Sequence, residues 1–474
     1  MTPEHDHRKE HVHFIGIGGS GLSAIARMLK ESGYSVTGSD MTFSPFAADL
    51  QAAGVTVLLG HAAENIRGAD WVVRSSAIGE ENVEVLAARA AGIPVFRRAD
   101  FLGKFMQDKQ GIAVAGTHGK TTTTAMIAFV LSELGLDPSF IVGGMLSNYG
   151  VNARAGRGSA FVVEADEYDR MFLGLKPQIE VITSLEHDHP DMFPTFEDML
   201  TAFDSFVSLL PHQGTLIGGF DDPAVAALLA KTRRVGRQVM AYSLRQESTI
   251  VAPRWMQGRN LQPNRLGGFD FDAATNVGST KLISLGLQVP GEHNVSNALA
   301  ALSVCAVMGL SVKDAAEALG RFAGTGRRFE VKGERGGVIV IDDYAHHPTE
   351  IRATLSAARR RYPSRRIWAV WQPHTYSRTQ TLFDAFVTAF EDADETIVTE
   401  IYRSREPRQD YSSEQVVKAM NHPSRRFVPT LEATTEYLLQ HVQPNDVVLV
   451  LSAGDADQIS ANLLARLGSE VKHG

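Results

Sequence analysis

The stretch Val114-Ala-Gly-Thr-His-Gly-Lys-Thr-Thr-Thr-Thr124 decides the fold of the middle of this chain. It follows residues 111–114, an apolar run typical of a buried strand, and leads into residues 125–131, an apolar run typical of a helix. A loop between a strand and a helix surrounds an anion with backbone N–H groups and the positive end of the helix. The common phosphate loop has a glycine where Val114 stands, so this loop is shorter and begins at Gly116. We therefore predict an ATP site made by Gly116, Thr117, His118, Gly119, Lys120, Thr121 and Thr122.

Length and composition narrow the class of protein. The 474 residues suffice for three domains of about 150 residues each. A net charge of -8 argues against a nucleic-acid-binding protein, which usually has an excess of basic residues. Cys305 is the only cysteine, so an internal disulfide is impossible and a reducing compartment is favoured. No apolar run approaches the ~20 residues of a membrane helix, so we expect a cytoplasmic protein without membrane insertion.

Strands alternate with helical segments in three successive blocks, which we assign to residues 1-109, 110-325 and 326-474. The predicted fold class is α/β, with a Rossmann-like parallel sheet in the first block and a Rossmann-like unit in the third. The second block has the pattern of a P-loop-type ATPase domain, and residues 240–290 predict a small antiparallel addition to it. The predicted strands are residues 12–17, 34–38, 55–59, 71–74, 94–96, 160–164, 180–184, 214–218, 338–342, 366–371, 395–398 and 446–451.

A glycine motif follows the first predicted strand. Gly16, Gly18 and Gly21 satisfy G-x-G-x-x-G, and Asp40 lies where a ribose partner is expected. Such a loop binds a pyrophosphate through backbone N–H groups, and both NAD and a UDP-sugar carry one. The motif alone leaves these two ligands open. The candidate residues for the diphosphonucleotide are Gly16, Gly18, Gly19, Ser20, Gly21 and Asp40, with Ser75 and Ser76 as weaker candidates after a later strand.

Acidic and histidine residues follow two strands of the second block. Residues 164–169 place four carboxylates at the end of an apolar strand, which costs repulsion unless a cation offsets it. Mg²⁺ prefers oxygen ligands, so Glu164 is the predicted ligand together with the hydroxyl of Thr121. His189, after the next strand, either holds a second Mg²⁺ or orients substrate, and a helix-capping or surface role is the alternative.

These motifs together resemble the Mur ligases, which join amino acids to UDP-muramoyl precursors of peptidoglycan. The resemblance is carried by Gly116-Thr-His-Gly-Lys-Thr121, Glu164-Ala-Asp-Glu, Glu186-x-Asp-His189-x-Asp191 and Gly291-Glu-His-Asn294-x-x-Asn297-Ala. Residues 342–350, 372–379 and 452–455 narrow it to the members that attach L-alanine to UDP-N-acetylmuramate. It implies three domains, which bind UDP-N-acetylmuramate, ATP with Mg²⁺, and the amino acid. It also implies that ATP phosphorylates the muramoyl carboxylate before the amine of L-alanine attacks.

The resemblance implies roles for individual residues. Lys120 and Thr121 would hold the phosphates and Mg²⁺, while Glu164 and His189 would ligate metal. Asn294 would contact adenine, Arg327 or Arg328 would face the γ-phosphate, and Asp343 and His347 would lie near the nucleotide and the amino acid. Arg328 and Arg378 suit phosphoryl or carboxylate oxygens because a guanidinium binds them in a planar fork. The expected catalytic residues are thus Lys120, His347, Arg328 and Arg378.

Two departures and three alternatives remain. Ser452 stands where relatives often carry glycine. Thr375 stands where many relatives carry arginine, so one positive contact to substrate is absent or supplied elsewhere. An NAD-dependent oxidoreductase would explain residues 16–40 but not Lys120 or Glu164. A non-catalytic nucleotide switch would explain the phosphate loop but not the acidic strand ends. A recycling ligase that attaches a whole tripeptide to the same acceptor is the nearest rival, and the expected assembly is a monomer or a homodimer.

Overall fold

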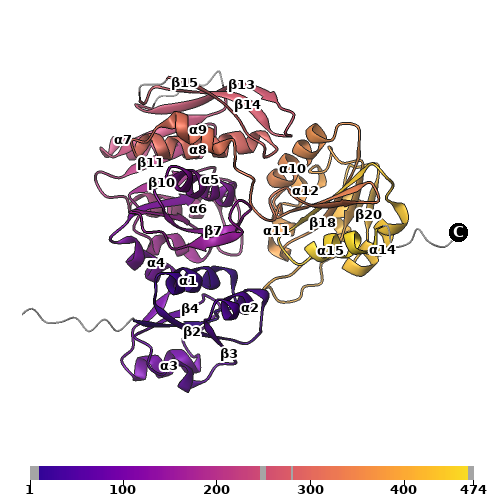
Figure 1. Cartoon of the computed structure of the whole chain (residues 1–474). Helices are drawn as coiled ribbons and strands as arrows, with labels where there is room; N and C mark the ends of the chain where they lie inside the picture. The colour runs from indigo at the N-terminus through magenta and orange to yellow at the C-terminus, as the bar shows by residue number, and fades with distance from the viewer. Residues whose placement is uncertain (1–9, 246–251, 279–280, 468–474) are drawn as a thin grey trace, which may run out of the picture.

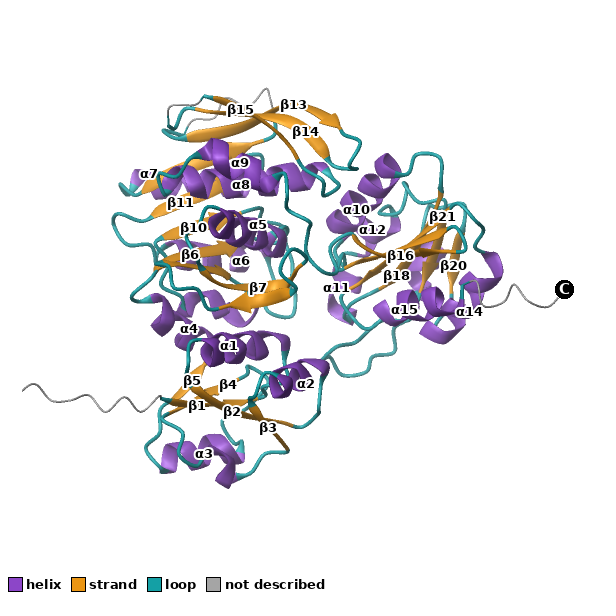
Figure 2. Cartoon of the chain, in the orientation of Figure 1, coloured by secondary structure: helices purple, strands orange, loops and turns teal. Residues whose placement is uncertain are grey.

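Three sheets, each with its own helices, follow one another along the chain (Figures 1 and 2). The computed structural model describes residues 10–245, 252–278 and 281–467. Its three α/β domains confirm the predicted fold class. Within those residues, every helix is too short or too polar to cross a lipid bilayer.

The N-terminal domain is a five-stranded sheet in the order β3-β2-β1-β4-β5, with every pairing parallel. The predicted strand at residues 12–17 ends at Ile15, because Gly16 turns the backbone with φ 84°. The elements are β1 (His11–Ile15), α1 (Ser20–Glu31), β2 (Ser35–Asp40), α2 (Pro45–Ala52), β3 (Thr56–Leu59), η1 (Ala63–Ile66), β4 (Trp71–Arg74), α3 (Val83–Ala90), β5 (Val95–Arg97) and α4 (Arg98–Met106).

The central domain is one ten-stranded sheet in the order β15-β14-β13-β12-β11-β10-β6-β9-β7-β8. The predicted antiparallel addition is present as β13, β14 and β15, and it continues the main sheet because β13 pairs in parallel with β12. The elements are β6 (Gln110–Ala115), α5 (Lys120–Glu133), β7 (Ser139–Leu146), β8 (Val151–Arg154), β9 (Ala160–Glu164), η2 (Tyr168–Gly174), β10 (Ile179–Ile182), α6 (Phe196–Val207), β11 (Thr215–Gly219), α7 (Pro223–Arg234), β12 (Gln238–Ser243), β13 (Trp255–Pro263), β14 (Phe269–Thr275), β15 (Leu282–Gly286), α8 (Glu292–Val307) and α9 (Val312–Leu319).

The C-terminal domain has a six-stranded sheet in the order β16-β17-β21-β18-β19-β20, parallel except for the edge strand β16. Its elements are β16 (Glu330–Arg335), β17 (Val338–Asp343), α10 (Pro348–Arg361), β18 (Arg366–Gln372), α11 (Tyr376–Thr381), α12 (Phe383–Val387), β19 (Glu395–Val398), α13 (Glu414–Ala419), β20 (Arg425–Phe427), α14 (Leu431–His441), β21 (Asp446–Ser452) and α15 (Asp457–Arg466).

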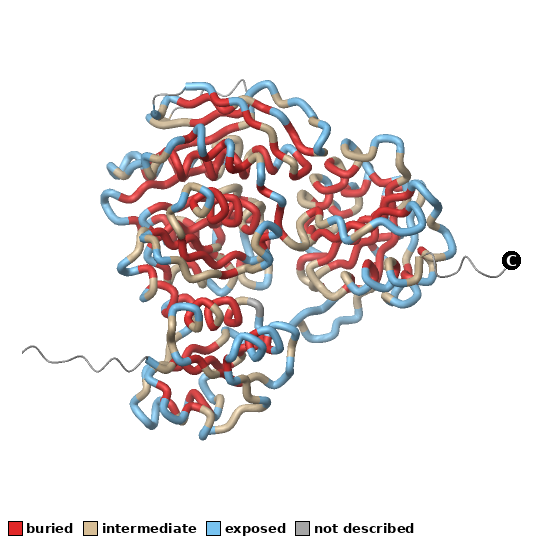
Figure 3. The backbone as a smooth tube through the Cα atoms, in the orientation of Figure 1, coloured by how far each residue is buried: buried red, intermediate tan, exposed pale blue. Residues whose placement is uncertain are grey.

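The hydrophobic core joins the first two domains and leaves the third separate. One continuous cluster contains Phe14 and Phe101 of the N-terminal domain together with Phe172 and Phe203 of the central domain. The C-terminal domain instead has two clusters of its own, on either side of its sheet. Figure 3 shows the buried backbone of each unit. Apolar burial therefore fixes the N-terminal domain to the central one, whereas the contacts that hold the C-terminal domain are polar.

A short segment connects the central and C-terminal domains. Thr325 forms a bridge with Leu146, and the N–H of Gly326 donates to the carbonyl of Met145 at 2.8 Å, so these residues belong to the central sheet. At the next residue the contacts change. The carbonyl of Arg327 accepts the N–H of Tyr344 at 2.7 Å, in the C-terminal domain.

Candidate active site

The predicted phosphate loop joins the end of β6 to the start of α5. Gly116 and Gly119 have φ values of 126° and 79°, which only glycine adopts without strain. A Cβ on Gly116 would overlap the hydroxyl of Thr183 on the neighbouring strand end, and one on Gly119 would lie 2.6 Å from Oδ1 of Asn297. The two glycines thus allow the backbone to turn tightly against its neighbours, with the N-terminus of α5 behind it.

Lys120 lies in this loop with its ammonium enclosed by acceptors. Its Nζ donates to Oε1 of Glu167 at 2.9 Å and to the carbonyls of Gly116 and Thr117 at 2.5 and 3.2 Å. Burial disfavours the charged form, but Glu167 and Asp166 outweigh it and raise the pKa of Lys120. The lysine is therefore a permanent cation at the mouth of the loop.

Two of the three predicted metal ligands are in contact. The hydroxyl of Thr121 donates to Oε1 of Glu164 at 3.0 Å, and the other carboxylate oxygen accepts the N–H of Gly143 at 2.7 Å. A hydroxyl and a carboxylate at the phosphate loop are oxygen ligands of the kind that Mg²⁺ takes, so these residues fit the ion. His189 is oriented differently, with Nε2 at 3.8 Å from Glu167 and 3.7 Å from Asp188.

His118 connects the phosphate loop to the C-terminal domain. Its Nε2 lies 2.8 Å from Glu186, and its Nδ1 lies 3.2 Å from Glu350 on α10. Burial lowers the pKa of this imidazole, but hydrogen bonds to the two carboxylates outweigh it and raise the pKa to about 9. Thr349 also donates to Glu186 at 2.9 Å from across the domain boundary.

His118, Glu186 and His347 lie close enough to suggest a metal site, since one ligand atom from each falls within 4.8 Å of the others. Both nitrogens of His118 face carboxylates, which keeps the ring protonated, and a protonated imidazole has no lone pair for a metal. The group is therefore an ion-pair network between two domains. His347 differs, because burial lowers its pKa and its Nε2 is buried without a hydrogen-bond partner among the described residues.

Arg378 makes a buried ion pair between the central and C-terminal domains. Its Nε and Nη2 both lie 2.8 Å from Oδ1 of Asp188, and its Nη1 lies 3.0 Å from Nδ1 of His374. The side chains of the pair are only 4% and 6% exposed. Arg378 and the other charges nearby hold the pKa of Asp188 well below its usual range, against the effect of burial.

The two arginines left open by the sequence have different surroundings. Nη2 of Arg327 donates to the carbonyls of Ser452 and Gly454, at 2.8 and 3.2 Å. Arg328 instead directs Nη1 to within 3.6 Å of Glu350, beside His118 of the phosphate loop. Of the two, Arg328 is therefore the one that lies beside the phosphate loop.

Asp343 and Asn294 are both engaged within the protein. The two oxygens of Asp343 accept the backbone N–H groups of Phe329 and Ala345, each at 2.7 Å, and burial raises its pKa to about 6. Asn294 and Asn297 form a buried chain with Thr123 of the phosphate helix, with hydrogen bonds of 3.0 and 3.1 Å. Their roles toward a nucleotide remain predictions.

The N-terminal glycine loop lies against β2. The N–H groups of Gly16 and Ile17 donate to the carbonyl of Ser39, and Oδ2 of Asp40 accepts the N–H of Gly18 at 2.9 Å. Asp40, which is predicted to bind a ribose hydroxyl, thus holds the loop in place through this hydrogen bond. Ser75 lies beside Gly16, whereas Ser76 is exposed, and Gly19 precedes α1, which Ser20 begins.

Sequence reasoning missed the acidic partners of these cations. Asp188, Glu167 and Glu350 were left without individual roles, although each balances a basic residue of the site. For Glu350 a signal existed, since it stands three residues after His347 in a capping-box spacing that the structure contains.

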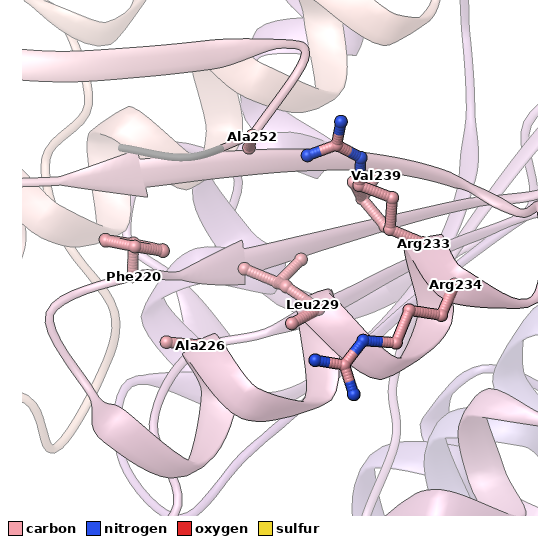
Figure 4. Close-up of a pocket in the computed structure, with 8 residues that line it drawn as sticks. Phe220, Ala226, Leu229, Arg233, Arg234, Val239 and Ala252 are labelled. Carbon is pink, nitrogen blue, oxygen red and sulfur yellow. The ribbon is translucent and has the colours of Figure 1, made fainter. Parts of the chain in front are cut away.

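A separate surface cavity of about 370 Å³ lies between α7 and β12 (Figure 4). Its lining is mostly apolar and includes Leu229 and Val239, together with the charged Arg233 and Arg234. None of the predicted site residues lines it. The cavity is therefore distinct from the phosphate loop and its partners.

Comparisons with known proteins agree with this architecture. Three family models match the chain one after another. They are the "Mur ligase family, catalytic domain" at residues 11–110, the "Mur ligase middle domain" at residues 114–305, and the "Mur ligase, glutamate ligase domain" at residues 327–454. A UDP-N-acetylmuramate–L-alanine ligase of Pelotomaculum thermopropionicum is 43% identical over 471 residues, which are 98% of this chain and 100% of that relative.

Solved structures give the same result. The UDP-N-acetylmuramate-alanine ligase of Thermotoga maritima has a TM-score of 0.77 at 28% identity, over 96% of this chain and 98% of that one. A murein peptide ligase of Psychrobacter arcticus has a TM-score of 0.71 at 27% identity, over 98% of this chain and 100% of that one. With all three family models matched in order and a full-length relative at 43% identity, the chain belongs to the Mur ligase family.

Proposed function

We propose that this protein is an ATP-dependent ligase that joins L-alanine to the carboxylate of UDP-N-acetylmuramate, a step of peptidoglycan synthesis. The observation that carries the proposal is the full-length similarity to relatives of that name, at 43% and 41% identity. The geometry supports it, because the phosphate loop and the third domain meet around one cluster of acidic and basic residues, and the N-terminal domain with its glycine loop shares its core with the central domain. An oxidoreductase would leave Lys120 and Glu164 without a role.

The reaction has two steps. A carboxylate oxygen of the muramoyl group attacks the γ-phosphorus of ATP, and ADP leaves with the pair of electrons from the broken P–O bond. The amine of L-alanine then attacks the acyl carbon, and phosphate departs with the former carboxylate oxygen. The amide forms with the loss of a proton from nitrogen.

The chain supplies positive charge for the first step. Lys120 and the N-terminus of α5 would hold the phosphates, and Arg328 would approach the γ-phosphate from the C-terminal domain. Mg²⁺ bound by Thr121 and Glu164, with His189 as the third expected ligand, would neutralise phosphate charge. Bringing the groups together on three domains supplies orientation.

His347 is the candidate catalytic histidine for the second step. Burial lowers its pKa, so the ring is neutral. Because Nδ1 accepts the N–H of Thr349 at 3.3 Å, the proton stands on Nε2, which is buried without a hydrogen-bond partner among the described residues and would donate to the reacting groups. Arg378 would orient His374 and the α11 segment toward the incoming amino acid. Because ATP and this class of precursor are intracellular, we propose a cytoplasmic location, as a monomer or a homodimer.

The decisive experiment measures ADP release by the purified chain with ATP and Mg²⁺. Release that requires both UDP-N-acetylmuramate and L-alanine supports the proposal, and release independent of either one rejects it. The recycling ligase remains the nearest rival, since a murein peptide ligase shares the fold at a TM-score of 0.71. Replacing L-alanine by L-alanyl-γ-D-glutamyl-diaminopimelate decides between them, and turnover only with the tripeptide would favour the rival.

A further inference from the structure

Residues 402–410 form a loop of the C-terminal domain that runs beside the start of α11. The N–H of Thr375 donates to the carbonyl of Tyr402 at 2.9 Å, which fixes the beginning of the loop. Further along, the carboxylate of Glu406 accepts the first two N–H groups of α11. Arg405 lies between these two anchors, so its backbone is held at the N-terminus of α11.

The guanidinium of Arg405 reaches the central domain. Its carbon lies 4.0 Å from the centre of the Tyr168 ring in η2. That ring in turn meets the imidazole of His189, the third expected metal ligand, edge to face at a centroid distance of 5.1 Å. A guanidinium stacked on an aromatic face keeps the N–H groups in its own plane free. Arg405 is exposed and forms no hydrogen bond or ion pair with any residue that the structure describes, so its fork is available to an anion.

Three other basic groups near the start of α11 are engaged or uncharged. All three guanidinium nitrogens of Arg378 face Asp188 or His374. Burial lowers the pKa of His346 to about 3 and that of His374 to about 2, so both rings are neutral at neutral pH. Of these four groups, only Arg405 offers a positive charge that the described residues leave unpaired.

Thr375 lacks the positive charge that many relatives have at this position. Its hydroxyl instead accepts the N–H of Arg378, at 3.4 Å. At neutral pH the carboxylate of L-alanine is ionised, and it must enter a site that already contains Asp188, Asp191 and the acyl phosphate. Like charges repel, so binding requires a cation that faces the amino acid.

We propose that Arg405 binds the carboxylate of the incoming L-alanine and so replaces the arginine that relatives carry at position 375. This inference rests on the proposed function. Stacking on Tyr168 would hold the planar fork so that both carboxylate oxygens accept N–H groups. Because Tyr168 belongs to the central domain, this arrangement would form only when the C-terminal domain is closed over it.

The test compares two nucleophiles in the ADP-release assay of the full-length protein, with saturating ATP and UDP-N-acetylmuramate. L-Alanine has the carboxylate, and L-alaninamide lacks it. Arg405→Gln is expected to lower kcat/KM for L-alanine by about 10- to 100-fold, mainly through KM, because charge-assisted hydrogen bonds are lost. Its kcat/KM for L-alaninamide should stay unchanged, since this nucleophile has no carboxylate to bind.

Three further variants separate substrate binding from a structural role. Arg403→Gln is the matched control, because Arg403 is an exposed arginine of the same loop, and both nucleophiles should react as with the unmodified protein. Arg405→Lys keeps the charge but loses the fork, so an intermediate kcat/KM for L-alanine is expected. Adding Thr375→Arg to Arg405→Gln should restore most of the lost kcat/KM for L-alanine.

Three results would overturn the inference. The first is a kcat/KM for L-alanine in Arg405→Gln within about twofold of the unmodified protein. The second is an equal loss with both nucleophiles, which would assign Arg405 to the domain contact with Tyr168 alone. The third is the absence of any recovery in the double variant. Failure of the unmodified protein to release ADP with L-alanine would instead reject the proposed function, and this inference with it.

Discussion

Replacing Asp188 by asparagine should break the polar contact that holds the C-terminal domain over the central one. Asp188→Asn leaves Arg378 as a buried cation without a countercharge, since Nε and Nη2 both lie 2.8 Å from the same carboxylate oxygen. Removing one partner of a buried pair costs about 3–5 kcal/mol. When the domains separate, water reaches the guanidinium, so the cost falls on the closed arrangement alone.

A free-energy change of about 1.4 kcal/mol alters an equilibrium constant tenfold. The ratio of closed to open molecules should therefore fall by about two to three and a half orders of magnitude. Small-angle scattering of the protein with a non-hydrolysable ATP analogue should show a more extended molecule, and kcat should fall by at least 100-fold where closure limits turnover. The Kd for UDP-N-acetylmuramate should stay unchanged, because the N-terminal domain shares its core with the central one.

Arg360→Gln is the matched control. The pair Arg360–Glu292 also joins the two domains, but its side chains are 48% and 50% exposed. Such a surface pair contributes about 0–1 kcal/mol, so kcat should change by less than fivefold. Equal scattering and equal kcat in Asp188→Asn and Arg360→Gln would refute the assignment of domain closure to the buried pair.

Three further predictions concern the phosphate loop. Lys120→Ala should abolish turnover while UDP-N-acetylmuramate still binds in calorimetry, and equal loss of both would argue against separate sites. Gly116→Ala should abolish ATP binding in equilibrium dialysis, because its φ of 126° is strained for alanine and a Cβ would overlap Thr183; near-normal ATP binding would contradict this reading. The His118 pKa is raised to about 9 from 6.5, so the stability that its protonated ring lends to the domain contact is complete below pH 6.5 and is lost as pH rises through 9. Scattering measured from pH 6 to 10 should show the domains separating on the alkaline side, and His118→Gln should remove that dependence; an identical profile in the variant would exclude His118 as its source.

Local patterns were sufficient to predict much of the fold. The strand at residues 71–74 and the glycine turns at Gly16 and Gly116 follow from short-range sequence, since apolar runs and glycines act within a few residues. β7 and β8 were missed, because Gly143 and Gly144 interrupt the pattern. The continuity of the ten-stranded sheet could not be predicted either, because the parallel pairing of β12 with β13 depends on tertiary packing and not on local sequence.

The candidate site could likewise be predicted only in part. The loop motif alone predicts the roles of Lys120 and Thr121, and the acidic end of the neighbouring strand predicts that of Glu164. The partners of His118 and Arg378 lie 232 and 190 residues away in sequence, and no local pattern specifies such pairs. Buried cations require countercharges, so a search for acidic residues in the remaining motifs would have pointed toward Glu350 and Asp188.

The connecting segment determines how the C-terminal domain can rotate. Gly326 is bonded to the central sheet and Arg327, with φ 56°, is bonded to the C-terminal domain, while the N–H of Arg328 donates back to the carbonyl of Thr325 at 3.2 Å. The pivot therefore lies within residues 325–328. Arg328 lies at the end of this segment and would move little when the domain rotates, whereas Glu350 on α10 and Arg378 on α11 would move further. Opening the molecule for substrates can therefore break the His118 and Asp188 contacts while Arg328 stays close to the phosphate loop.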